Sequence, residues 1–305
     1  MDPQSPIRPP RQSVPRASRR SVLRRLAGTA AAVATSAVPR SFAAAQEGLS
    51  VTEVTSAANG SPTVVLVHGA FADASGWNGV VDRLQTAGVS VVATPNPLRG
   101  IAHDAAYVAS AISQIPGPVL AVGHSYGGAV ITNACTGLPN VSGLVYVAAF
   151  IPDEGETLLQ ILGGSRDSVI APALVELRYP TGNGAETAVE YAIAAGRFRD
   201  VFAADVPPKD AAVMAAAQRP IAQVCFGEET RAAAWKTLPS WAVVPTGDKA
   251  AGSDVVRSMA RRAKADIVEA EGSHAIMVSQ PQAVADQITT ALVAVGGTLV
   301  AAPAA

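Results

Sequence analysis

The sequence predicts an α/β protein built on a mostly parallel β-sheet. Apolar runs alternate with helix-spaced segments over residues 63–150, and the same alternation returns from residue 241. Strands buried on both faces read as continuous apolar runs, and strands that alternate with helices pair in parallel. A third observation is an apolar strand that passes through a Gly-rich turn into a helix near residue 125. Such a unit projects a side chain from the carboxyl edge of the sheet.

Composition limits the possible partners. The chain has 305 residues, a formal net charge of −1 and a hydrophobic fraction of 49%. This is enough chain for one large domain with a sizeable core. The near-neutral charge argues against nucleic acid or an anionic membrane surface as a partner. No His, Cys and Asp cluster has metal-ligand spacing, so neither a metal nor an organic cofactor is expected.

The first 45 residues resemble an export signal. Residues 1–17 are rich in Pro and Arg, and the paired Arg19 and Arg20 precede a mildly apolar stretch over residues 26–38. Three alanines at 43–45 match the small-residue pattern that signal peptidases cut. These features predict a twin-arginine-type signal over 1–45 and a single domain over 46–305 in the periplasm or outside the cell, with no stable membrane association. A disordered basic arm or an organelle transit peptide is the alternative.

The elements of the first half follow in order. After a possible edge strand at 49–55, the pattern predicts strands at 63–67, 89–93, 119–122 and 141–150. Helical spacing of apolar residues predicts helices at 76–86, 102–115 and 128–135.

The pattern changes at residue 151. From 151 to about 220 no strong strand is visible, and Gly-rich breaks at 163–164 and 181–184 separate segments that look helical, such as 187–195 and 209–217. We interpret 151–220 as a helical lid over the carboxyl edge of a core formed by about 63–150 and 221–295. The alternation resumes with strands at 241–244 and 267–269 and helices at 253–264 and 281–295.

The Gly-rich turn reads Gly123-His124-Ser125-Tyr126-Gly127 and fits the pattern G-x-S-x-G. Between a strand and a helix, this pattern forces the serine into a strained backbone conformation with its hydroxyl exposed. Gly123 and Gly127 are expected to be required because a Cβ there would clash with the facing strand and helix.

Several motifs occur in a fixed order: His68-Gly69, the turn around Ser125, Gly247-Asp248 after a late strand, and Gly272-Ser273-His274 near the end. This set resembles the α/β-hydrolase family over about residues 63–295, and is most similar to its small esterases and hydroxynitrile lyases. The resemblance implies the α/β-hydrolase fold, with a mostly parallel sheet flanked by helices and a small helical lid.

A serine hydroxyl is a weak nucleophile that needs a base within hydrogen-bond distance and a carboxylate to orient that base. Among the four histidines, His274 follows the last strand, so its ring can return over the carboxyl edge toward Ser125. His124 is expected to point away from the serine, His68 to make structural hydrogen bonds, and His103 to be solvated. We therefore assign His274 as the base.

Two positions compete for the acid. Asp248 follows the strand at 241–244, while Asp153 and Glu154 follow the strand that ends at Phe150. Asp248 is favoured, because Ser125, Asp248 and His274 then reproduce the chain order of the family. Asp153 or Glu154 remains the alternative.

An oxyanion intermediate needs two preorganised N–H donors. The backbone N–H groups of Tyr126 and Ala70 are assigned to this role, with that of Phe71 as an alternative to Ala70. Phe71 and His124 are assigned to substrate binding.

Together these assignments predict a serine hydrolase that cleaves small, mostly apolar carboxylic esters through an acyl-enzyme. Lid residues Leu159, Phe198 and Phe202 are expected to set the acyl-chain preference. Perhydrolase or haloperoxidase-like chemistry, a hydroxynitrile lyase using Lys249, and a non-catalytic binding protein remain alternatives. A carboxylate-dependent dehalogenase does not fit, because a serine occupies the nucleophile position. Cys135 and Cys225 are not expected to form a disulfide.

Overall fold

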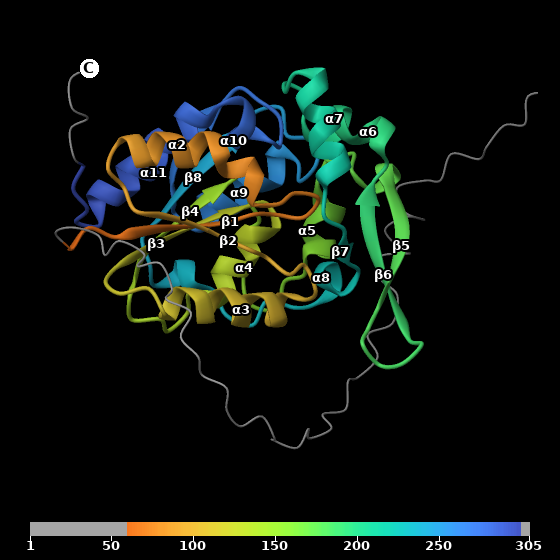
Figure 1. Cartoon of the computed structure of the whole chain (residues 1–305), viewed down its shortest axis with the longest axis horizontal. Helices are drawn as coiled ribbons and strands as arrows, with labels where there is room; N and C mark the ends of the chain where they lie inside the picture. The colour runs from red at the N-terminus through yellow and green to blue at the C-terminus, as the bar shows by residue number, and fades with distance from the viewer. Residues whose placement is uncertain (1–59, 300–305) are drawn as a thin grey trace, which may run out of the picture.

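The computed structural model describes residues 60–299 and contains a central six-stranded parallel sheet (Figure 1). The export signal and the edge strand predicted at 49–55 lie outside these residues. The strand order is β2-β1-β3-β4-β8-β9. The strands are β1 (Thr63–Val67), β2 (Val91–Thr94), β3 (Val119–His124), β4 (Val141–Val147), β8 (Ser240–Pro245) and β9 (Asp266–Ala270).

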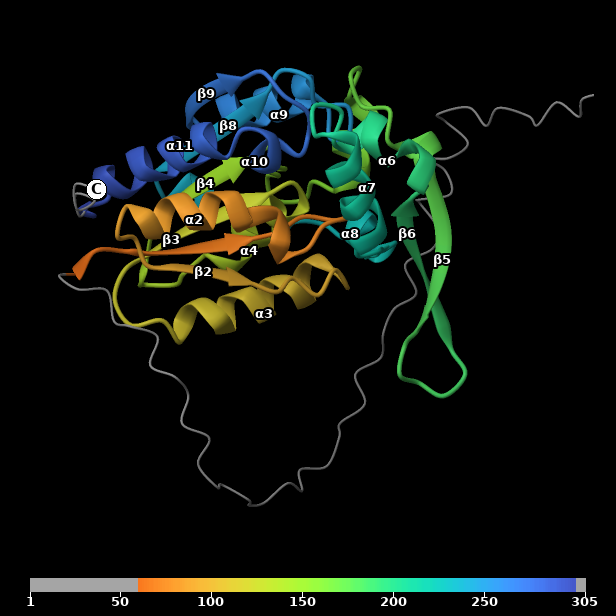
Figure 2. The ribbon, with the colours of Figure 1, turned by 45° about the horizontal axis from the view of Figure 1, so that its top comes forward.

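Helices cover both faces of this sheet, giving three layers (Figure 2). One face packs against α2 (Asn78–Thr86), α10 (Ile276–Ser279) and α11 (Pro281–Ala294). The other packs against α3 (Ile101–Ser113), α4 (Tyr126–Ala134) and α9 (Ser253–Arg262). Successive strand residues divide between the two layers: Val64 and Leu66 enter the first core, while Val65 and Val67 enter the second. The continuous apolar runs therefore reflect burial on both faces.

The predicted core elements are confirmed, with shifted boundaries. The first helix starts as a 3₁₀ turn, η2 (Ala74–Trp77), and the strand predicted to reach residue 150 ends at Val147. Both cysteines are free and buried. Among residues 60–299, no helix is both long and apolar enough to cross a membrane.

The sequence predicts a helical insertion at 151–220, but the structure shows that this insertion is only partly helical. It contains α5 (Leu158–Gly164), η3 (Ala171–Ala173), α6 (Ala195–Phe202) and α7 (Pro208–Ala217), and also a β-hairpin. The hairpin joins β5 (Leu174–Pro180) to β6 (Thr187–Ile193), and β7 (Ile221–Ala222) extends it to three antiparallel strands. After β7 come α8 (Val224–Gly227) and η4 (Ala234–Lys236).

The sequence predicts a helix at 187–195, but most of this segment forms β6. Residues 181–184, taken as a helix break, are the loop of the hairpin, where Gly182 and Gly184 have φ of 87° and 63°. The helix predicted at 209–217 is α7. Antiparallel pairing of β6 with β5 thus outweighs the local helix propensity of its alanines.

Candidate active site

Ser125 stands between the end of β3 and the start of α4, with φ 52° and ψ −122°. This left-handed backbone region is costly for any residue with a Cβ, and such strain persists only where surrounding contacts hold it. Three backbone hydrogen bonds do so. The N–H of Ser125 donates to Val147 O (3.2 Å), and its carbonyl accepts from the N–H groups of Gly128 (3.0 Å) and Phe150 (3.1 Å).

Two glycines allow this turn to pack closely. A Cβ on Gly123 would lie 2.6 Å from the carbonyl oxygen of Gly127, and one on Gly127 would lie 2.9 Å from that of His68. Both obstacles are backbone atoms, which cannot turn aside as a side chain could. The steric requirement predicted from the sequence is therefore present at both positions.

His274 and Asp248 form a buried pair. Nδ1 of His274 lies 2.7 Å from Oδ2 of Asp248, and their side chains are only 2% and 0% exposed. The other carboxylate oxygen, Oδ1, accepts from the backbone N–H groups of Ala250 (2.9 Å) and Ala251 (3.0 Å). Because Nδ1–H donates to the carboxylate, the neutral ring carries its lone pair on Nε2. Ser125 and His274 line the same cavity.

The alternative acids have other partners. Asp153 Oδ1 lies 2.6 Å from Nζ of Lys236, and this hydrogen bond lowers the pKa of the Asp153 carboxyl. Glu154 also faces Lys236, at 3.6 Å. Only Asp248, of these three carboxylates, contacts His274.

His124 does not fulfil its assignment to substrate binding. Its ring is fully buried, packs edge-on against Trp77 and Phe202, and is absent from the cavity wall. As the last residue of β3, His124 points toward the sheet face that Trp77 covers. Nε2–H of His124 donates to the carbonyl of His274 (3.0 Å). Burial, with the nearby His274, holds the pKa of His124 well below its usual range, so His124 is neutral and supports His274 through this hydrogen bond.

His68 fixes the loop that follows β1. Its Nδ1–H donates to Gly69 O (2.9 Å), and its Nε2 accepts from the N–H of Asn96 (3.1 Å). The Asn96 side chain returns a hydrogen bond to His68 O (2.9 Å). Burial lowers the pKa of His68, which favours the neutral ring. The tautomer with its proton on Nδ1 makes both of these ring hydrogen bonds.

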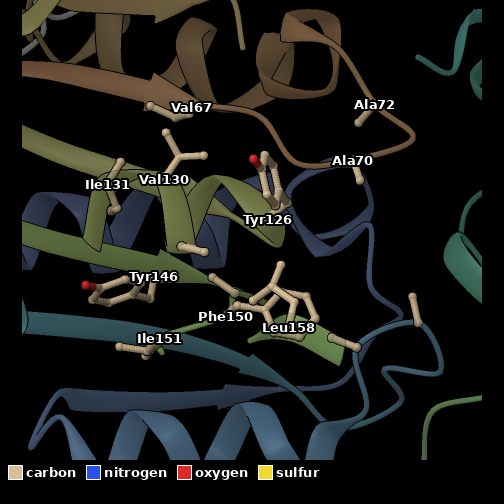
Figure 3. Close-up of a cluster of buried hydrophobic side chains, with 14 of the residues drawn as sticks. Val67, Ala70, Ala72, Tyr126, Val130, Ile131, Tyr146, Phe150, Ile151 and Leu158 are labelled. Carbon is tan, nitrogen blue, oxygen red and sulfur yellow. The ribbon is translucent and has the colours of Figure 1, made fainter. Parts of the chain in front are cut away.

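The two assigned oxyanion donors lie beside the serine. Figure 3 shows Ala70 on the loop after β1, next to the first turn of α4, which carries Tyr126. Both residues line the cavity with Ser125. The N–H of Phe71 instead donates to Arg219 O (3.1 Å), which removes the alternative donor. The side chain of Phe71 does line the cavity, as a substrate-binding residue should.

The cavity is apolar. Its empty space, including the opening to solvent, is about 340 Å³. Besides Ser125 and His274, the wall consists of Ala70, Phe71, Tyr126, Phe150, Leu158, Leu162, Ile170, Ile221, Phe226, Ala250 and Ala251. The wall contains no Asp, Glu, Lys or Arg side chain.

The lid reaches this wall through Leu158, Leu162 and Ile170 rather than through the lid residues predicted from the sequence. Leu159 does not line the cavity. Phe198 and Phe202 stack on each other at 5.0 Å between ring centroids, and Phe202 packs edge-on against His274 at 4.9 Å. Phe202 therefore supports the ring of His274, Phe198 supports Phe202, and neither phenylalanine lines the cavity.

A polar network that the sequence did not reveal surrounds the side chain of Tyr126. Its hydroxyl donates to the buried Asp104 (2.8 Å), which also accepts from the backbone N–H of Arg99 (3.0 Å). Burial raises the pKa of Tyr126, so the hydroxyl remains a donor. The Arg99 guanidinium in turn lies 3.1 Å from Glu190 of β6 and 4.3 Å from the ring centroid of Tyr179 of β5. The lid hairpin is thereby tied to the loop that precedes α3.

The family of this chain follows from comparison with known proteins. Residues 64–287 match the model of the alpha/beta hydrolase family. The chain belongs to that family. A carbendazim hydrolyzing esterase from Nocardioides sp. (strain SG-4G) is 47% identical over 45 residues, which are 14% of this alpha/beta hydrolase and 19% of that esterase.

Solved structures share the fold of this alpha/beta hydrolase. Polyneuridine aldehyde esterase superposes with a TM-score of 0.65 at 18% identity, covering 76% of this chain and 99% of that one. A methylesterase from Arabidopsis gives 0.62 at 19% identity, covering 76% and 99%. A pyrethroid hydrolase gives 0.60 at 23% identity, covering 76% and 98%.

Proposed function

We propose that this alpha/beta hydrolase is a serine esterase in which Ser125, His274 and Asp248 act as the catalytic triad. The observation that carries the proposal is the buried 2.7 Å contact between His274 Nδ1 and Asp248, on a cavity wall shared with Ser125. Such a carboxylate holds the imidazole in the tautomer that accepts a proton at Nε2.

The reaction would run in two steps. The Oγ of Ser125 attacks the ester carbonyl carbon while Nε2 of His274 takes the hydroxyl proton, and the backbone N–H groups of Ala70 and Tyr126 stabilise the oxyanion. The tetrahedral intermediate collapses to an acyl-enzyme, and His274 returns the proton to the departing alcohol. Water then attacks the acyl carbon with His274 as base, releasing the carboxylic acid and restoring the Ser125 hydroxyl.

Substrates are proposed to be small, mostly apolar carboxylic esters. The support is the wall itself: beyond the reacting groups it presents aliphatic and aromatic side chains, which bind uncharged acyl and alcohol groups through burial of apolar surface. The three similar structures described above are an esterase, a methylesterase and a pyrethroid hydrolase. Lys249, the residue considered for a lyase, is exposed and outside the wall.

A panel of p-nitrophenyl esters of increasing acyl length tests the proposal. Wild-type protein should hydrolyse the short members with a burst of nitrophenol, because an acyl-enzyme accumulates. Ser125→Ala should lower kcat by about 10⁴-fold or more while the fold is retained. Ser113→Ala, at an exposed position on α3, is the matched control and should behave as wild type. Stoichiometric ester binding without turnover would indicate a binding protein instead.

A further inference from the structure

The outer edge of the lid hairpin is open. Among the strands of residues 60–299, β5 pairs only with β6, at the edge of the small sheet. Figures 1 and 2 show this hairpin projecting from the body of the molecule. Val175 and Leu177 on β5 are 40% and 42% exposed. Exposed edge strands are templates for pairing with another chain.

One face of β5 carries a row of apolar side chains, and the other face carries two charged side chains. Because side chains alternate along a strand, Val175, Leu177 and Tyr179 share one face, while Glu176 and Arg178 share the other. The edge thus carries an apolar row on one face and one charge of each sign on the other. Glu176 and Arg178 lie 3.9 Å apart within the chain and are both exposed.

We propose that β5 pairs antiparallel with β5 of a second copy of this chain, about a twofold axis at Leu177. In this register Glu176 lies opposite Arg178 of the partner subunit, and the symmetry produces this pair twice. Val175 then lies opposite Tyr179 of the partner subunit, and the two Leu177 side chains meet at the axis. Opposite charges and apolar side chains placed directly across a strand pair both stabilise it.

Charge selects this register over its neighbours. Centring the axis on Glu176 would place two glutamates opposite each other, and centring it on Arg178 would place two arginines opposite each other. Like charges directly opposite are destabilising. The resulting interface is isologous, which is the commonest arrangement in homodimers. It would join the two small sheets and bury the open edges of both.

A charge-complementation experiment tests the pairing by sedimentation of the purified full chain. Glu176→Arg leaves two arginines on each edge, and Arg178→Glu leaves two glutamates, so each variant alone should be monomeric where the wild type is a dimer. An equimolar mixture should restore the dimer, because every opposed pair is again of opposite sign. Neither residue lines the cavity, so both variants should retain the ester hydrolysis of the wild type.

Crosslinking gives a second readout. The two native cysteines are buried, so Leu177→Cys supplies an exposed thiol at the twofold axis, within disulfide range of its symmetry mate. Mild oxidation should yield a disulfide-linked dimer faster than in the control Val213→Cys, whose position on α7 is 62% exposed. A wild type that stays monomeric at all concentrations, variants that dimerise separately, or equal crosslinking of the two cysteine variants would each overturn the proposal.

Discussion

The hydroxyl of Tyr126 donates to the buried carboxylate of Asp104 over 2.8 Å, so the residue whose N–H we propose as an oxyanion donor is also anchored by its side chain. Tyr126→Phe removes this anchor. We expect kcat to fall with KM little changed, because an oxyanion donor acts on the transition state. The free energy of unfolding should fall by about 1–3 kcal/mol, as for other hydrogen bonds to buried charged groups.

The matched control is Tyr146→Phe. The Tyr146 hydroxyl is also buried, but it pairs with Thr132 (3.0 Å) and does not line the cavity. This variant should lose stability without the fall in kcat. Equal kcat values in the two variants would show that the Asp104 contact does not position the donor.

Asp248→Asn should reduce kcat by about 10⁴-fold, because an amide can no longer select the imidazole tautomer with its lone pair on Nε2. Steady-state hydrolysis of a short aryl ester measures this effect. Asp153→Asn should retain activity, since the carboxylate of Asp153 contacts Lys236. A mild effect at Asp248 together with a severe one at Asp153 would move the acid to the earlier strand.

Substitutions at two adjacent leucines of the lid distinguish an effect on the shape of the cavity from an effect on the packing of the lid. Leu158 lines the cavity and Leu159 does not. Leu158→Ala should shift the ester preference toward longer acyl chains because it enlarges the wall, whereas Leu159→Ala should leave the chain-length profile unchanged. Labelling by a small organophosphorus probe should persist in both variants, since that probe reports on Ser125 and His274.

Lowering the pH should destabilise the fold at pH values above those at which most carboxylates titrate. Burial lowers the pKa values of His68 and His124 in the folded protein, whereas in the unfolded chain they titrate near pH 6.5. Below that pH the unfolded state binds more protons, so the free energy of unfolding should decrease as pH falls from about 7.5 to 5. Urea unfolding of His68→Asn should show a shallower decrease than wild type. Ser113→Ala, at an exposed position that carries no titratable group, should keep the wild-type slope.

Export can be tested on the protein itself. We expect the twin-arginine-type segment to be removed, leaving an N-terminus near Gln46 that intact mass spectrometry of a non-cytoplasmic fraction can identify. Replacing Arg19 and Arg20 by lysines should leave unprocessed chain in the cytoplasm. Recovery of intact Arg19-Arg20 outside the cytoplasm would contradict cleavage.

The sequence predicts those features that depend on local pattern. The apolar runs of β1 and β3 and the glycines around Ser125 are local signals, and Asp248 and His274 follow strands whose carboxyl ends share one edge. The direction of the His124 ring could not be read in this way, because it depends on which face the last residue of β3 presents. The hairpin was missed for another reason: residues 187–195 satisfy both helix and strand propensities, and only pairing with β5 decides between them.

The contacts of Arg99 could not be predicted either. Its guanidinium meets Glu190 and Tyr179, which are brought to it only when the lid folds back on the body. No spacing along the chain indicates such a meeting, because each residue alone is an ordinary charged or aromatic side chain.

The order of strands in the sheet also bears on how the chain acquires activity. Ser125 follows β3 near the middle of the sheet, whereas His274 follows β9, which joins the edge beside β8. A folding intermediate with β1 to β4 in place would hold a formed turn at Ser125 and yet have no base to activate it. Pairing between distant segments is slow compared with local structure formation. Because β8 and β9 are neighbours in the sequence, the distant pairing is that of β8 with β4. Recovery of esterase activity during refolding should therefore report when that pairing brings Asp248 and His274 to Ser125.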